Sequence, residues 1–339
     1  MPEVDVSVLI PVLNEERHLR DAVRSMQRQH LDGNAEFVFV DGRSEDATRA
    51  ILDELAESDP RIRVFDNPRR ITPAGLNIAL RHARGEFVAR MDAHTRYPSN
   101  YLDSGVRRLR RGDVAWVGGP QLPHGDGPWS RRVAIATRSW AGLGGGAAFR
   151  MGDDRETETD TLFTGMWRRS TVVELGGWDE GWPTNQDVEL AGRIRLAGGR
   201  IVCLPEMAAE YVPRDSLRKL GRQYYKYGLY RAKTAKRHPH TLRRSHILCP
   251  GVCLTAVAAA IAPRPLAKIA RLGVGVYGLA VLTASAREAR PGQRADAALL
   301  PAVFTTMHLS WGAGFLTGMA RFGVPFAGLI RAFKPRRPR

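Results

Sequence analysis

Over residues 1 to about 115, short apolar runs alternate with amphipathic stretches. The runs at 6–12, 36–40, 62–65 and 86–91 have the length and the β-branched or aromatic content of buried strands. Between them we expect a helix from 14 to about 29, one capped by Ser44 or Asp46 that runs to 55, and one that begins at Thr72-Pro73. This alternation predicts an α/β fold with a mostly parallel sheet.

Residues 116 to about 160 depart from this pattern, because they are first glycine-rich and then acidic. Leu143-Gly144-Gly145-Gly146 and Asp153-Asp154-Arg155-Glu156 indicate a mobile loop, which would be either a lid over a site or a solvated surface loop. The core pattern returns at 161–165 and 172–177. A helix is then predicted over 188–197 and a final strand over 201–204.

The composition becomes apolar after Arg244, in runs at 246–262, 269–286 and 295–319 that basic residues separate. Each run is near or slightly below the roughly 20 residues that a membrane-spanning helix needs. Spanning helices, an interfacial hairpin bundle and a soluble helical cap all fit, and arginines at the ends of the runs favour association with membrane lipid. We therefore expect an α/β domain over 1–240 and a hydrophobic helical, membrane-associated region with a basic tail over 241–339.

The formal net charge of +16 fits nucleic acid, an anionic membrane surface or a diphosphate ligand. Lys and Arg are spread along the chain, and the common nucleic-acid-binding signatures are absent, so we expect no nucleic-acid partner. Three cysteines without CxxC spacing argue against a disulfide framework and a zinc site. The first residues enter a strand without a signal-peptide pattern, which predicts a cytoplasmic α/β domain at the cell membrane.

Three acidic positions indicate the chemistry. Asp41 and Asp92 each follow an apolar run, at the carboxyl ends of strands where open α/β sheets bind ligands. Asp92 and His94, two residues apart, suit Mg²⁺ or Mn²⁺, and the imidazole favours Mn²⁺. A metal there would neutralise a diphosphate, and Asp187, ahead of a predicted helix, would take a proton from a nucleophile. This combination predicts nucleotide-sugar chemistry.

Absent motifs narrow the alternatives. No G-x-G-x-x-G follows the first strand and no Walker A sequence is present, which argues against NAD and P-loop chemistry. A nucleotidyltransferase would carry a glycine-rich loop, and residues 11–17 contain no glycine. A binding or scaffold protein with a degenerate transferase fold remains a further alternative. Such a protein would be indicated by the loss of Asp92 or Asp187, and both residues are present.

Several motifs, in the same order along residues 6 to about 228, resemble those of the family-2 glycosyltransferases, which have the GT-A nucleotide-diphospho-sugar transferase fold. They are Ile10-Pro11-Val12-Leu13-Asn14-Glu15, Val40-Asp41-Gly42-Arg43-Ser44-Glu45-Asp46-Ala47-Thr48, Gly75-Leu76-Asn77-Ile78-Ala79, Asp92-Ala93-His94, Gly176-Gly177-Trp178-Asp179-Glu180 and Asn185-Gln186-Asp187-Val188-Glu189-Leu190. The resemblance is most pronounced for succinoglycan-type exopolysaccharide glucosyltransferases, which share Met91-Asp92-Ala93-His94, Asp160-Thr161, Gln223-Tyr224-Tyr225-Lys226-Tyr227-Gly228 and His308-Leu309-Ser310-Trp311-Gly312.

The resemblance implies a role for each matched residue. The nucleoside pocket would be lined by Pro11, Glu15, Asp41 and Ser44. Asn77 and Arg90 would stand near the base or diphosphate. The metal and donor phosphates would be held by Asp92 and His94. Asp187 would be the general base that activates an acceptor hydroxyl, and Gly165, Trp178 and Trp182 would shape the acceptor side unless the tryptophans belong to the core.

The implied activity is that of an inverting, metal-dependent hexosyltransferase. It would move one sugar, glucose from UDP-glucose, to a membrane-held saccharide or polyprenyl-diphosphate-linked acceptor in exopolysaccharide or cell-envelope glycan synthesis. Two departures matter, because Gln186 replaces the acidic neighbour that many relatives have, and the Gln-x-x-Arg-Trp motif of processive relatives is absent, which favours single-sugar transfer. Four tyrosines lie near Lys226 and Arg231, namely Tyr224, Tyr225, Tyr227 and Tyr230. Together with these cations they would either bind a lipid diphosphate or form the packed side of a helix.

Overall fold

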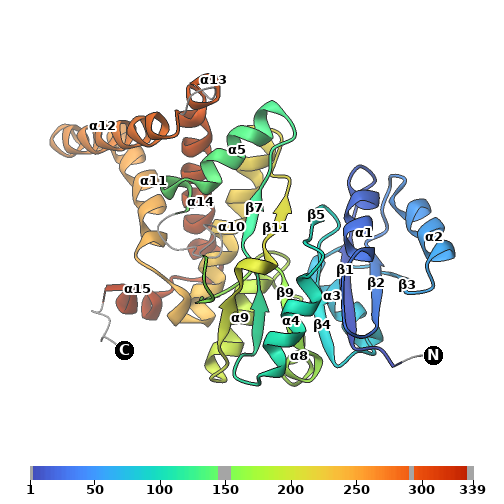
Figure 1. Cartoon of the computed structure of the whole chain (residues 1–339). Coiled ribbons are helices and arrows are strands. Elements are labelled where there is room, and N and C mark those ends of the chain that lie inside the picture. Colours follow the sequence, from blue (N-terminus) through green and yellow to red (C-terminus); the bar gives the residue numbers. More distant parts are fainter. Residues whose placement is uncertain (1–2, 144–153, 290–293, 334–339) are drawn as a thin grey trace. The chain divides into compact units, whose positions relative to one another are not determined.

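The computed structural model describes residues 3–143, 154–289 and 294–333 (Figure 1). The chain forms two compact units, the first from residues 1–122 and 148–211 and the second from residues 123–147 and 212–339. Compactness places α10 (Leu217–Arg237) with the C-terminal helices. The domain boundary expected at residue 240 from the change in composition stays a prediction.

Within the described residues, the first unit is built on an eight-stranded, mostly parallel sheet. β1 pairs in parallel with β2 and β4, β2 with β3, and β10 with β6, whereas β9 is antiparallel to β4 and β6. The predicted α/β fold is confirmed. The strand order is β3 (Ile62–Asp66), β2 (Ala35–Asp41), β1 (Val6–Val12), β4 (Phe87–Arg90), β9 (Gly165–Arg168), β6 (Trp116–Gly118), β10 (Ile201–Cys203) and β8 (Thr157–Glu158).

A second sheet of the first unit has the order β5 (Thr95–Arg96), β11 (Ala209–Tyr211) and β7 (Gln121–Pro123). Because β11 follows β10, the prediction that the strand near 201–204 is the last one is wrong. The short β11 carries few branched apolar residues, so its sequence gives little sign of a strand.

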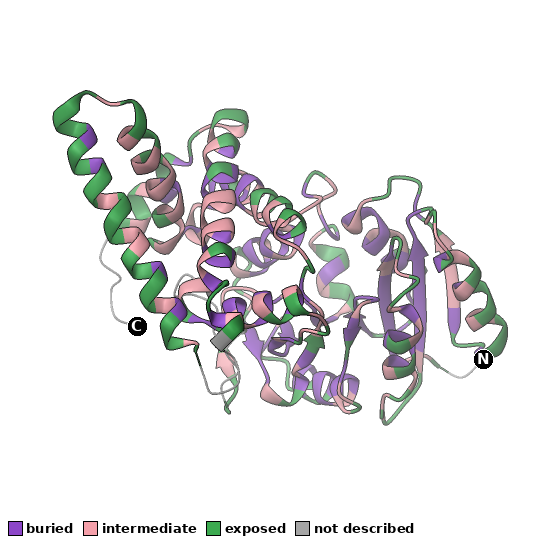
Figure 2. Cartoon of the chain, turned by 90° about the horizontal axis from the view of Figure 1, so that it is seen from above, coloured by how far each residue is buried: buried purple, intermediate pink, exposed green. Residues whose placement is uncertain are grey.

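Each face of the large sheet has its own apolar core, and the strands are drawn as buried in Figure 2. Side chains alternate between faces along a strand. Val8 and Ile10 of β1 therefore enter one core, and Leu9 enters the other. The first core is covered by α1 (Leu19–Gln27), α2 (Thr48–Ser58) and α4 (Tyr101–Arg110), and the second by α3 (Thr72–His82), α8 (Arg169–Glu174) and α9 (Gln186–Leu196).

The first helix begins at Leu19 and not near residue 14 as predicted. Asn14 adopts a left-handed backbone conformation with φ 55°, which ends the strand and delays the helix. Its side-chain oxygen accepts a hydrogen bond from the backbone N–H of Glu45 at 2.8 Å. The loops after β1 and β2 are thus tied together, and the sequence pattern of residues 14–18 alone does not reveal this contact.

Part of the segment 116–160, for which no helix was predicted, is helical. α5 (Pro128–Arg138) and α6 (Trp140–Leu143) belong to the second unit, and residues 144–153 lie outside the described residues. Beyond them, Glu156 is held by Arg108, whose Nε and Nη2 each donate to it at 2.8 Å. The mobile loop expected from Leu143 to Glu156 stays a prediction for 144–153.

The second unit is helical. The apolar runs form α11 (Ser245–Ile261), α12 (Arg264–Arg287) and α14 (Leu300–Phe322). The short α13 (Arg294–Ala297) lies between α12 and α14, and α15 (Phe326–Phe333) follows α14. α14 contacts α5, α10, α11 and α12, and its residues Leu300, Val303, Phe304 and Met307 form a core with α5. Two helices, α12 and Ala295–Phe322, are long and apolar enough to cross a membrane, judged by length and composition alone.

Glycines bring α10 and α14 into backbone contact. A Cβ atom on Gly314 would lie 2.0 Å from the backbone oxygen of Tyr225, and one on Gly228 would lie 2.0 Å from that of Trp311. Because backbone atoms of packed helices move little, a side chain at either position would separate the two helices.

Gly314→Ala is expected to lower the free energy of unfolding by about 3 kcal/mol, since the added methyl group collides with main chain. The matched control is Gly275→Ala in α12, where no atom of the described residues lies within 4 Å of the added Cβ. There, alanine is expected to be neutral or to stabilise by up to about 1 kcal/mol, because it is the better helix former. Thermal unfolding of both variants in detergent tests this, and equal shifts in Tm would contradict the close packing.

Candidate active site

The order of the strands in the sheet reverses at β1. This strand has β2 on one side and β4 on the other, although β2 and β3 lie between β1 and β4 in the sequence. In open α/β sheets, ligands bind beyond the carboxyl ends of the strands at such a point. Glu15 follows β1, and Asp92 and His94 follow β4. Asp41 ends β2, one strand further along. The fold therefore gathers the predicted residues at one edge.

Arg90 and Asp92 form a buried ion pair at this edge. Arg90 Nε donates to Asp92 Oδ1 at 3.0 Å and Nη2 donates to Oδ2 at 3.3 Å, and the two side chains are 4% and 7% exposed. Tyr97 Oη accepts a hydrogen bond from the Asp92 backbone N–H at 2.7 Å. Tyr97 was not predicted, because a single tyrosine five residues after Asp92 forms no recognisable pattern.

Burial disfavours the charged guanidinium of Arg90, but the negative charges of Asp92 and Asp187 outweigh this effect and raise its pKa. Asp187, in the first turn of α9, is therefore close enough to act on Arg90. The Nη1 group of Arg90 is buried and makes no hydrogen bond with any of the residues that the structure describes. An unsatisfied buried donor costs about 1–3 kcal/mol, so this N–H group marks a place where an anionic ligand would be stabilised.

His94 is oriented by Glu15, whose Oε1 lies 3.0 Å from His94 Nδ1. The two side chains are 35% and 23% exposed, so the pair is open to a ligand. With Nδ1 engaged by a carboxylate, Nε2 is the nitrogen that would bind a metal, and the carboxylate raises its basicity. This is the arrangement that metal-binding histidines commonly have.

The residues present can bind a divalent cation only if the substrate supplies the remaining ligands of the cation. Among residues 3–143, 154–289 and 294–333, no group of three or more His, Cys, Asp or Glu side chains is placed to hold a metal. Asp92 and His94 would supply two ligands, which suits Mg²⁺ or Mn²⁺, since such ions commonly take further oxygens from substrate phosphates and water. The donor set thus matches a metal that arrives with a diphosphate.

Asp41 and Ser44 form a second polar pair. Ser44 Oγ donates to Asp41 Oδ1 at 2.6 Å and accepts from the backbone N–H of Asn14 at 2.9 Å. The N-cap residue of α2 is Ala47, which makes no side-chain capping bond, so the prediction that Ser44 or Asp46 caps this helix is wrong. Asp46 Oδ1 instead accepts a local hydrogen bond from the Thr48 N–H at 3.0 Å, and Ser44 faces the loop after β1.

Asn77 fastens α3 to the segment that precedes α9. Its Nδ2 donates to the Trp178 backbone oxygen at 2.8 Å, and its Oδ1 accepts from the Trp178 backbone N–H at 2.8 Å. Trp178 is buried, with its ring edge-on to that of Trp167 at 5.7 Å, so it is a core residue and not a sugar platform. Gly177 is required beside it, because a Cβ there would lie 2.5 Å from Asn77 Oδ1. The predicted place of Asn77 beside the donor stays a prediction.

Asn77→Ala is expected to lower the free energy of unfolding by about 2–3 kcal/mol, since it leaves the backbone N–H and C=O of Trp178 without their partners. Asn100→Ala is the control, because Asn100 precedes α4 without a side-chain capping bond. It is expected to cost about 0.5 kcal/mol or less. Urea unfolding of both variants gives the comparison, and similar midpoints would show that the Asn77 bonds contribute little.

Comparison with known proteins identifies the family. Residues 7–173 match the family model described as glycosyl transferase family 2. The succinoglycan biosynthesis protein ExoA of Rhizobium meliloti (strain 1021) is 33% identical over 321 residues, which cover 91% of this chain and 93% of that protein. The chain belongs to glycosyltransferase family 2.

A further relative of this family-2 glycosyltransferase is the dolichyl N-acetyl-alpha-D-glucosaminyl phosphate 3-beta-D-2,3-diacetamido-2,3-dideoxy-beta-D-glucuronosyltransferase of Methanococcus voltae. It is 24% identical, over 66% of this chain and 71% of that protein. Among solved structures, the mannosyltransferase PcManGT from Pyrobaculum calidifontis, in complex with GDP-Man and Mn²⁺, has a TM-score of 0.60 and 21% identity over 94% of this chain and 87% of that chain. This likeness confirms the GT-A fold.

This glycosyltransferase brings most of the predicted site residues together. Glu15 is hydrogen-bonded to His94 and Arg90 is hydrogen-bonded to Asp92, and the charge of Asp187 acts on Arg90. Pro11 packs against α3, because a Cβ atom added to Gly75 would lie 3.2 Å from the Cβ atom of Pro11. The individual roles of these residues stay predictions.

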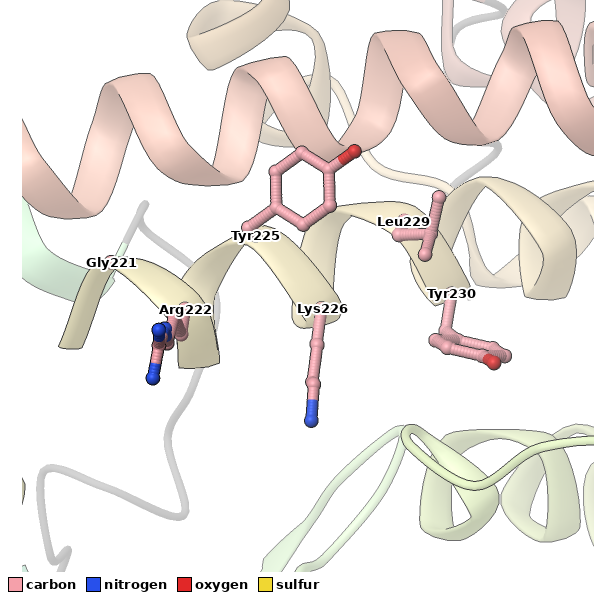
Figure 3. A pocket seen from close by; sticks show the side chains of 6 residues that line it. All are labelled: Gly221, Arg222, Tyr225, Lys226, Leu229 and Tyr230. Atoms are coloured by element: carbon pink, nitrogen blue, oxygen red, sulfur yellow. The ribbon is translucent and has the colours of Figure 1, made fainter. Parts of the chain in front are cut away.

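The aromatic cluster of the glycosyltransferase divides between two sides of α10. Tyr225 and Tyr230 line a hollow of about 710 Å³ together with Gly221, Arg222, Lys226 and Leu229 (Figure 3). On the other side, Tyr224 and Tyr227 pack together with ring centroids 5.7 Å apart, and Gln223 Nε2 donates to Tyr227 Oη at 2.9 Å. Packing and an open surface thus both occur, for different tyrosines.

Proposed function

We propose that the protein is an inverting, metal-dependent glycosyltransferase that moves a single sugar from a nucleotide sugar to a membrane-held acceptor. The observation that carries this proposal is the buried pair of Arg90 and Asp92, with His94 two residues further on and the charge of Asp187 within reach. These positions support a diphosphate site and a base at the same edge of the sheet, which is what glycosyl transfer requires.

In this proposal Asp92 and His94 hold Mg²⁺ or Mn²⁺, and Glu15 orients His94. The cation, when bound with the donor, neutralises charge on the departing diphosphate. Arg90 Nη1 adds a buried positive donor beside it. Pro11, Asp41 and Ser44 line the nucleoside pocket, with Glu15 at its edge. PcManGT, with GDP-Man and Mn²⁺, supports a nucleotide sugar and a divalent cation as ligands.

Asp187 then acts as the base. Its carboxylate takes the proton of an acceptor hydroxyl, the hydroxyl oxygen forms a bond to the anomeric carbon, and the bond from that carbon to the diphosphate oxygen breaks. The nucleoside diphosphate leaves with the bonding electrons. Because attack comes from the face opposite the leaving group, the anomeric configuration is inverted.

The proposed donor is UDP-glucose, and the proposed acceptor is a saccharide carried on a polyprenyl diphosphate at the cytoplasmic side of the cell membrane. The relation to ExoA, which is named for succinoglycan biosynthesis, supports exopolysaccharide or cell-envelope glycan synthesis. The Methanococcus voltae relative, whose name gives a dolichyl phosphate sugar, supports a lipid-linked acceptor. The hollow on α10 offers Arg222 and Lys226 for phosphate and the rings of Tyr225 and Tyr230 for sugar.

The experiment measures donor binding first and turnover second, with the full chain in detergent. Calorimetry with UDP-, GDP- and TDP-sugars, each with Mn²⁺, Mg²⁺ or EDTA, is expected to reveal one donor whose binding needs the metal. Release of the matching nucleoside diphosphate is then measured with and without a lipid extract as acceptor. Binding of no nucleotide sugar would overturn the proposal, and binding without turnover in the presence of acceptor would indicate a scaffold protein.

A further inference from the structure

The net positive charge of the protein comes from its C-terminal part. Residues 212–339 contain 23 Lys and Arg but only three Asp and Glu, whereas residues 1–211 contain 28 and 32. Lys and Arg are spread along the chain, and it is the acids that are unevenly distributed. From 216 to 287 the chain has no acidic residue at all. The strong excess of positive charge in the helical unit therefore favours binding to an anionic partner.

α11 and α12 form an antiparallel hairpin with a two-residue turn. Arg271 Nε donates to the Ala259 backbone oxygen at 3.2 Å, and a Cβ on Gly273 would lie 3.0 Å from Thr255. Figure 2 draws α12 as exposed along most of its length. Its large apolar side chains that are more than half exposed are Leu266, Ile269, Leu272, Val276, Leu279 and Leu282.

α14 offers no comparable surface, although it is long and apolar. Gly314 and Gly318 lie against the backbone of α10, and Gly312 lies against that of α11. On α10, Arg222 and Lys226 are exposed. α14 is therefore the core helix of its unit, and a bilayer would meet the hairpin instead.

The hairpin carries two adjacent stripes near its turn. Leu266, Ile269 and Leu272 follow helical spacing and make an apolar stripe, and Arg264, Lys268 and Arg271 make a basic stripe beside it. Cations in the first turn of a helix are disfavoured by the helix dipole, which favours an anion there. Both features are typical of a helix that lies in the headgroup region of an anionic bilayer.

A spanning orientation fits these residues poorly. The 17 residues of α11 extend about 25 Å, less than the roughly 30 Å of a hydrocarbon core, and Pro250 interrupts its hydrogen bonding. A spanning hairpin would also carry three basic residues of its turn across the membrane, against the bias that keeps such residues on the cytoplasmic side.

We propose that the α11–α12 hairpin lies in the plane of an anionic leaflet, on the side of the membrane that holds residues 1–211. The apolar stripe enters the interface, and Arg264, Lys268 and Arg271 contact lipid phosphates. This assigns a monotopic attachment to the protein and does not depend on the proposed reaction.

The first test locates the turn. Lys268→Cys is introduced into the full chain after Cys203, Cys249 and Cys253 are replaced by serine, and a membrane-impermeant maleimide is applied to spheroplasts and to inverted membrane vesicles. Labelling is expected only in inverted vesicles, as for the control Arg24→Cys on the exposed side of α1. Labelling of the introduced thiol from the opposite side would show that the hairpin spans, and labelling from neither side would place the turn inside the bilayer; either result overturns the proposal.

The second test measures the role of the charges. Flotation compares vesicles of phosphatidylcholine alone with vesicles that also contain phosphatidylglycerol. The triple variant Arg264→Gln, Lys268→Gln and Arg271→Gln is expected to bind the anionic vesicles roughly 100-fold less tightly, from about 1 kcal/mol for each basic residue. The control with the same loss of charge is Arg24→Gln, Arg110→Gln and Arg111→Gln, all exposed on the first unit. Equal losses in both variants would mean that net charge alone matters and would contradict the specific stripe.

Discussion

Asp187→Asn is expected to lower kcat about 10³-fold while the affinity for the nucleotide sugar changes little. The amide has nearly the same shape as the carboxylate but cannot accept the acceptor proton. Asp187 lies in the first turn of α9, where Asn185, with φ 62°, ends the incoming loop. Its charge acts on buried Arg90, which places it beside the proposed diphosphate site. Single-turnover rates and calorimetric donor affinities measure the two effects separately.

The control for this variant must be a carboxylate outside the site. Glu189, on the same helix, is unsuitable because it is fully buried and bonded to Arg193, with Nε 3.0 Å from both of its oxygens. Glu174→Gln, at the exposed end of α8, is suitable and is expected to keep full activity. A loss of less than about tenfold for Asp187→Asn would remove Asp187 from the role of base.

His94→Ala is expected to reduce kcat/KM about 10³-fold and to raise the Mn²⁺ concentration needed for half-maximal activity, since it removes a proposed metal ligand. Its side chain is about one-third exposed, so the fold should tolerate the change. Glu15→Gln is expected to have the same kind of effect but smaller, about 10-fold to 100-fold, because it only orients His94. Metal titrations of both variants provide the measurement.

This pair of variants also separates the two roles that Glu15 has been given. If Glu15 acts on the nucleoside, Glu15→Gln raises the donor KM at saturating Mn²⁺ and leaves the metal dependence unchanged. If it orients His94, the metal dependence shifts first. His30→Ala, at an exposed position, is the control and should match the unmodified protein in both measurements.

The strands and the acidic positions were predictable because both depend on local patterns. Apolar runs of strand length lie in the sequence itself, and an acid after such a run marks the end of a strand. The bond between Asn77 and Trp178 was not predictable, since it joins residues 101 positions apart. The same holds for the contact of Glu15 with His94, across 79 positions, which orients the side chain proposed as a metal ligand.

The predictions of secondary structure were wrong or incomplete where a special backbone conformation or tertiary packing decides the structure. Asn14, with positive φ, delays α1, although acids after it resemble a helix start. α5 was missed because the surrounding glycines favour a loop, whereas Val133 and Ala136 are buried against α14. The tyrosines of α10 could not be divided between a packed and an open side without knowing where α14 lies.

The path of the chain has a consequence for synthesis. α6 is bonded to α14 through Ala141, whose backbone oxygen accepts from His308 Nε2 at 3.0 Å, and these residues are 167 positions apart. At about 5–20 residues per second, a ribosome needs roughly 10–30 s to supply α14 after α6 has emerged. During that interval Val133 and Ala136 cannot be buried against α14. In a chain that ends at residue 240 they would stay unburied by α14 permanently. The helix α5 is therefore expected to expose apolar side chains on the nascent chain until α14 has been made.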